Sequence, residues 1–124
     1  MYSTHVYRTY GGCGIWQTLE EEKGTPYGYL YDDVKRAFQI EKLDWVNNTL
    51  NKPLFIGETG CDLSLTGDEL QRELMAWNNT LTIFNEWEIH YTAFWWREIG
   101  IFPLHHGQPS FNPTESGQIF KEAL

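Results

Sequence analysis

The chain has 124 residues, a length that suits one ordinary domain and is too short for two. Nine Lys and Arg against 17 Asp and Glu give a net charge of −8, which argues against nucleic acid and against an anionic membrane surface as partners. No stretch approaches the roughly 20 consecutive apolar residues of a membrane span, and the first residues lack the basic and apolar regions of a signal peptide.

Aromatic residues are unusually frequent, with 6 Trp, 7 Tyr and 7 Phe. An acidic, aromatic-rich composition is often met in carbohydrate-handling proteins, because sugar rings stack on flat aromatic faces. The alternative is an aromatic-rich core, to which Trp45 and Trp77 on predicted helices would belong. The hydrophobic fraction of 41% is compatible with such a packed core.

The first half of the chain predicts a strand, a helix and a second strand. Residues 3–9 are short, β-branched and aromatic, which is typical of a strand. Residues 31–48 carry an apolar stripe that predicts a helix, and Pro53 would prevent its continuation. The apolar run at 54–57, which ends at Glu58, indicates a strand buried on both faces of a parallel sheet.

The second half repeats the alternation. Thr66 and Glu69 fit a capping box at the start of a helix. The apolar face of that helix consists of Leu70, Leu74, Trp77, Leu81 and Phe84. Residues 89–96 predict a third strand. Asn112 and Pro113 then predict the N-cap and first position of a last helix. The core face of that helix is expected to contain Ile119, Phe120, Ala123 and Leu124.

Alternating strands and helices predict an α/β fold in which parallel strands are joined by right-handed crossovers. Three consecutive βα units fill residues 1–124 as one partial domain, whereas an eight-unit barrel needs roughly 250 residues. Three parallel strands also leave two bare sheet edges. We therefore expect a piece of something larger, or a protein that completes itself by association.

Functional residues of α/β folds lie at the carboxyl ends of the strands. Glu58 comes directly after the buried run at 54–57, and burial of a carboxylate costs several kcal/mol unless it is paired. Gly57 before it allows another group to approach closely. We interpret Glu58 as a functional carboxylate; the alternative is a structural glutamate paired with a lysine.

The first and third strands end in polar and aromatic side chains. His5 and Tyr7 share one strand face and could reach a glutamate two strand spacings away, at about 4.8 Å per spacing. Phe94 and Trp96 share a face of the third strand, and Trp95 points the other way. The alternative for His5 and Tyr7 is a half-buried pair without a functional role. The alternative for the aromatic residues of the third strand is core packing.

Three segments at these strand ends together resemble motifs of glycoside hydrolase family 5, in clan A of the (β/α)8 glycosidases. Residues 4–7 (Thr-His-Val-Tyr) resemble the His-x-Tyr of that family's sixth strand, and residues 53–60 resemble the seventh-strand motif around the nucleophile. Residues 91–96 resemble the aromatic eighth strand, and residues 117–124 the last helix. The resemblance implies the C-terminal part of a TIM barrel from a cellulase-like, retaining enzyme that cleaves β-linked glucans or mannans.

The resemblance also implies a role for each matched residue. Glu58 would be the nucleophile that attacks the anomeric carbon. Tyr7 would donate a hydrogen bond that keeps this carboxylate ionised, and His5 would line the subsite around the cleaved bond. Trp95, or else Trp96, would form the sugar-stacking floor. Outer subsite contacts are expected from Tyr10, Trp16 and residues 97–106.

A retaining glycosidase needs a second carboxylate roughly 5–5.5 Å from the nucleophile. In the family it belongs to an Asn-Glu pair on the fourth strand, which would precede residue 1. Asn85-Glu86 is expected on the opposite side of the sheet, and Glu98 has no precedent in the family. Because general acid help contributes about 10²–10⁴-fold, the chain alone is expected to turn over little or nothing. The alternative function is a non-catalytic, carbohydrate-binding or self-associating barrel fragment.

Neither a metal nor a cofactor is expected. His105 and His106 are adjacent, so they point in different directions, and no third ligand has suitable spacing. Cys13 and Cys61 follow strands on the same side, which leaves open one bridge or two free thiols. The expected partners are an oligo- or polysaccharide and either the N-terminal part of the barrel or a second copy. An extracellular location is expected if the full-length parent is a secreted cellulase.

Overall fold

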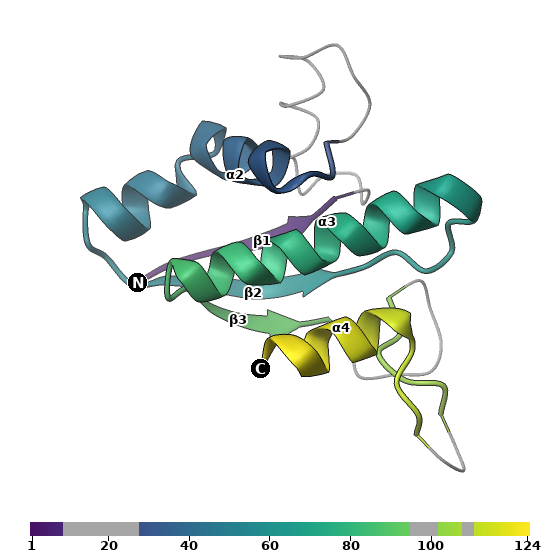
Figure 1. The fold of residues 1–124 in the computed structure, drawn as a ribbon. Helices are drawn as coiled ribbons and strands as arrows, with labels where there is room; N and C mark the ends of the chain where they lie inside the picture. The colour runs from purple at the N-terminus through teal and green to yellow at the C-terminus, as the bar shows by residue number, and fades with distance from the viewer. Residues whose placement is uncertain (9–27, 95–101, 108–110) are drawn as a thin grey trace.

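Strands and helices alternate along the chain in a computed structural model that describes residues 1–8, 28–94, 102–107 and 111–124 (Figure 1). The elements are β1 (Tyr2–Tyr7), α2 (Tyr31–Ile40), a π-helix (Trp45–Thr49), β2 (Leu54–Gly60), α3 (Gly67–Glu86), β3 (His90–Ala93) and α4 (Glu115–Ala123). The predicted α/β class, with a strand before each of three helical segments, is confirmed.

The sheet has the order β1-β2-β3, and β2 pairs in parallel with both neighbours. Strands that follow one another in the sequence are therefore neighbours in the sheet. Right-handed crossovers that always step in the same direction place their helices on one face. The helices accordingly form one layer, in which α3 packs against both α2 and α4 (Figure 1).

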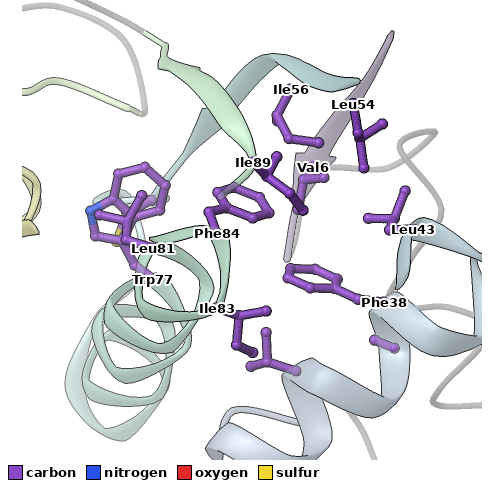
Figure 2. Packing of buried hydrophobic residues seen from close by; sticks show 13 residues of the cluster. Val6, Phe38, Leu43, Leu54, Ile56, Trp77, Leu81, Ile83, Phe84 and Ile89 are labelled. Carbon is purple, nitrogen blue, oxygen red and sulfur yellow. The ribbon is translucent and has the colours of Figure 1, made fainter. Parts of the chain in front are cut away.

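The hydrophobic core lies between the sheet and this helix layer (Figure 2). Phe38 of α2 stacks on Phe84 of α3 with ring centroids 5.4 Å apart. Strand residues Val6 and Ile56 contribute from the sheet side, and all four side chains are buried. Trp77 also belongs to this core, as predicted.

The helix predicted over residues 31–48 is interrupted. Lys42 adopts a left-handed φ of 64°, a conformation that ends α-helices, and the chain resumes as the π-helix. Trp45, at the start of the π-helix, is 48% exposed, so its assignment to the core is wrong. The break takes this segment off the helical period of α2, which otherwise directs an apolar stripe at the sheet.

The helix α3 begins where the sequence predicts but without the predicted capping box. Thr66 is the N-cap residue, and its side chain makes no capping hydrogen bond. Glu69 instead accepts a hydrogen bond from Arg72 at 2.7 Å and lies 3.9 Å from Arg8. Guanidinium groups thus take the place of the backbone amide as partners of this carboxylate.

The helix α4 begins two residues later than Asn112 predicts. Thr114 is the N-cap residue: its hydroxyl accepts a hydrogen bond from the Gly117 amide at 3.1 Å and donates one to the Pro103 carbonyl at 2.6 Å. The contact with the Pro103 carbonyl therefore favours Thr114, rather than Asn112, as the N-cap residue. Leu124 is 85% exposed, which corrects the predicted core face. The remaining members of that face pack against the core: Ile119, Phe120 and Ala123.

A buried ion pair joins the carboxyl end of β1 to α3. Arg8 Nη1 lies 2.9 Å from Glu73 Oε2, and both side chains are almost completely buried. The Asp62 amide donates to the other carboxylate oxygen at 3.1 Å. Burial raises the pKa of Glu73, and the hydrogen bonds from Arg8 and from the Asp62 amide oppose that rise. Three segments thus meet at one carboxylate.

We predict that Arg8→Met lowers the free energy of unfolding by about 3–5 kcal/mol, because it leaves the Glu73 carboxylate buried without its cation. Urea denaturation measures this change. Arg72→Met is the control, since it removes a largely exposed pair and should cost under about 1 kcal/mol. Equal losses in the two variants would contradict a structural role for the buried pair.

We also predict that Gly117→Ala destabilises the fold by about 2 kcal/mol or more. A Cβ at this position would lie 1.8 Å from the Leu104 carbonyl oxygen, so the helix or residue 104 must move. At an open helical site the same change stabilises by roughly 0.5–1 kcal/mol. Thermal unfolding checks the sign, and the exposed neighbour Gln118→Ala serves as the control with little expected effect.

Candidate functional site

The candidate site is built on an irregularity in the central strand β2. Its pairing with β1 is regular up to Thr4, which pairs with Ile56. The next residue of β1, His5, pairs with Glu58 and skips Gly57. One extra residue on β2 therefore lies opposite β1, which is the definition of a β-bulge.

The same extra residue appears on the other side of β2. Tyr91 of β3 pairs with Ile56, and Ala93, two residues later, pairs with Thr59, three residues later. The bulge is thus a property of β2 itself, shared by both ladders. An isolated glycine inside a strand pattern is a known sequence signal for a bulge, and Gly57 is that signal in this chain.

The bulge changes which face of the sheet Glu58 occupies. Side chains alternate along a strand, so in a regular β2 Glu58 would share the helix-covered face with Leu54 and Ile56. With one residue added, Thr59 takes that face beside its partner Val6. Glu58 then lies on the opposite face, which the helix layer does not cover.

Two side chains of β1 meet one oxygen of Glu58. The Tyr7 hydroxyl donates a hydrogen bond to Oε2 at 3.1 Å, and His5 Nδ1 lies 3.4 Å from the same oxygen. The expectation that these residues reach across two strand spacings is wrong, because β1 and β2 are adjacent and one spacing suffices. The carboxylate is 38% exposed and His5 is 47% exposed, so both groups remain accessible.

Close packing holds the Tyr7 ring in place. Its centroid lies 4.9 Å from that of Phe102, and the side chain is only 4% exposed. A Cβ on Gly60 would lie 3.2 Å from this ring and 2.5 Å from the Phe94 carbonyl oxygen. The absence of a side chain at Gly60 therefore lets three segments close around Tyr7, which orients its hydroxyl toward Glu58.

Four predicted substrate-binding residues lie outside the described residues. They are Tyr10, Trp16, Trp95 and Trp96. Cys13 and Glu98 fall outside as well. Phe94, the last described residue of the aromatic segment, packs edge-on against Phe102 at 6.4 Å. The sugar-stacking role of the third strand stays a prediction.

Asn85 and Glu86 lie at the end of α3, next to the amino end of β3. The Tyr31 hydroxyl donates a hydrogen bond to Glu86, and the Asn85 amide donates to the Ala123 carbonyl at 2.8 Å. Glu58 lies toward the carboxyl end of β2. Because the strands are parallel, the two carboxylates lie at opposite ends of the strands, as the sequence predicts.

The two histidines predicted to point in different directions have different environments. His105 is buried, its Nδ1 accepts a hydrogen bond from the Gly107 amide at 2.9 Å, and its ring packs against Phe111. His106 is exposed. Within the described ranges, no group of three or more His, Cys, Asp or Glu side chains could hold a metal ion. No helix in that part of the chain has the length and apolar character to cross a bilayer.

Cys61, at the end of β2, is a free and buried thiol. Burial raises its pKa far above the ordinary thiol value, and the negative charges of Glu73 and Asp62 raise it further. The thiolate is the nucleophilic form of cysteine. Cys61 is therefore unsuited to nucleophilic catalysis beside Glu58.

We predict that Cys61 of the folded protein reacts with iodoacetamide at least about 100-fold more slowly than the same residue in urea, because the native thiol is both protonated and inaccessible. Peptide mapping by mass spectrometry follows Cys61 separately from Cys13. The urea-unfolded chain is the internal control. Equal rates in the two states would show that the thiol is accessible and ionisable in the native protein.

The chain matches no model of a known protein family, and no curated protein sequence is significantly similar to it. A functional assignment therefore depends on the motifs and on the geometry around Glu58.

Proposed function

We propose that Glu58 is the nucleophile of a retaining glycosidase that hydrolyses O-glycosyl bonds of a β-linked polysaccharide. The observation that carries the proposal is the meeting of the Tyr7 hydroxyl and His5 Nδ1 at Oε2 of Glu58. The resemblance of the three strand ends to glycoside hydrolase family 5 assigns these residues the same roles. Chemistry and motif thus favour the same three side chains.

The contacts suit a nucleophilic carboxylate. A hydroxyl that donates to one carboxylate oxygen fixes the orientation of the group, and the carboxylate is the form that attacks. Both contacts fall on Oε2, so Oε1 is the oxygen that would bond to the anomeric carbon. The glycosidic bond then breaks with its electron pair on the leaving oxygen, and water later hydrolyses the glycosyl ester. The packed Tyr7 ring would keep the attacking oxygen oriented.

The arrangement of the sheet supports the proposed barrel. In a (β/α)8 barrel the strands follow one another in sequence order, and all helices lie on the outer face. In a doubly wound sheet the order reverses and helices cover both faces. The order β1-β2-β3 with one helix layer resembles the first pattern. His5 and Glu58, on the uncovered face, would then point into the barrel at the carboxyl ends of its strands.

The proposed reaction needs an acid/base carboxylate about 5–5.5 Å from Glu58, which further βα units would supply. The chain alone should therefore act only on substrates whose leaving group needs no proton. A second candidate function is association without catalysis. It is favoured by the edges of the sheet, since β1 and β3 each pair with β2 alone in the described part of the chain.

Covalent labelling tests the proposed nucleophile. A fluorinated glucoside with a dinitrophenolate leaving group requires no general acid, and its glycosyl ester hydrolyses slowly enough to be detected. We expect a mass adduct that maps to Glu58. Tyr7→Phe should slow labelling about ten-fold, because the carboxylate loses the group that orients it.

Glu58→Gln should abolish the adduct. Glu88→Gln changes an exposed carboxylate just before the amino end of β3 and should leave the adduct unchanged. An adduct on another residue, or none with the unmodified chain, would refute the nucleophile. A chain that forms no adduct and sediments as a stable oligomer would favour the association function.

A further inference from the structure

The bulge that turns Glu58 toward the uncovered face leaves Gly57 without a partner in either strand register. A backbone group outside the ladder still requires a hydrogen bond. Thr92 of β3 provides one: its hydroxyl donates to the Gly57 carbonyl at 2.6 Å and lies 3.4 Å from the Ile56 carbonyl. The side chain of a neighbouring strand thus binds the carbonyl of the bulged residue.

We propose that Thr92 is a positioning residue for Glu58. The Gly57 carbonyl belongs to the peptide group whose nitrogen is that of Glu58, and this group is planar. By holding the carbonyl, Thr92 fixes the orientation of the peptide and hence the direction in which the Glu58 side chain leaves the strand. Its importance for catalysis rests on the proposed function; its effect on geometry does not.

The surroundings of Thr92 favour this role over ordinary packing. The residue is exposed, so its methyl group contributes little to the core. It lies between Tyr91 and Ala93, which face the helix layer, so Thr92 lies on the same face as Glu58. The carboxylate is therefore held from β1 through its own oxygen and from β3 through its backbone.

Gly57 lies beside His5 of β1, and its carbonyl accepts the hydrogen bond from Thr92 of β3. A Cβ there would lie 3.4 Å from His5 Nε2, which is van der Waals contact distance, so the position packs directly beside the imidazole. The bulge, the His5 ring and the Thr92 hydroxyl are thus all in contact at Gly57. Removal of the Thr92 hydroxyl should release the peptide without changing any group that contacts the carboxylate.

The test compares Thr92→Val, which keeps the shape and loses the donor, with Thr92→Ser, which keeps the donor. The first readout is the NMR cross-peak between the Tyr7 ring and the Glu58 methylene protons, which requires no glycosidase activity. The second is the rate of Glu58 labelling. We expect Thr92→Val to lose the cross-peak and to slow labelling about ten-fold or more, and Thr92→Ser to retain both.

Thr82→Val is the matched control, because it removes a threonine hydroxyl that donates to the Asn78 carbonyl at 2.9 Å within α3. It should change neither readout. If Thr92→Val does not fold, Thr92→Ala replaces it in the comparison with Thr92→Ser. An unchanged cross-peak in the donor-free variant, or equal losses in the Ser and donor-free variants, would overturn the proposal. Absence of any adduct on the unmodified chain refutes the nucleophile alone, and the cross-peak still decides the positioning role.

Discussion

The candidate site depends on one extra residue in the central strand. In a sheet the side-chain period is two, so a single insertion exchanges the two faces for every residue beyond it. Without the bulge at Gly57, the Glu58 carboxylate would lie under the helix layer, where burial of a charge costs several kcal/mol. With it, the hydrophobic pattern of β2 remains in the core, and the carboxylate reaches His5 and Tyr7.

Stability and candidate chemistry occupy opposite faces of the same sheet. The core and the Arg8–Glu73 ion pair lie on the helix side. The groups around Glu58 lie on the other side, where the carboxylate stays partly exposed. Because the two sets share only the strands, substitutions at Glu58 should leave the fold largely intact.

The N-cap of α4 and the break after α2 are features that local sequence patterns did not predict. The apolar spacing of α3 predicted the helix, since that period depends only on neighbouring turns. Trp77, Leu81 and Phe84 of the predicted face are in the core, whereas Leu70 is not part of it. The cap of α4 was misplaced because Thr114 is selected by the Pro103 carbonyl, a partner distant in sequence. The break at Lys42 and the exposed Trp45 carried no comparable signal, because the stripe over residues 31–48 reads as continuous.

The sequence by itself determined the alternation of strands and helices, because short apolar or β-branched runs and the helical period of 3.6 residues are local properties. It also singled out His5, Tyr7 and Glu58 as strand-end residues. Only the tertiary structure decided that Glu58 faces away from the helices, that Thr92 binds the Gly57 carbonyl and that Arg8 pairs with Glu73. Strand register and buried pairs are set by partners far apart in the chain, and no local period encodes which residues will meet.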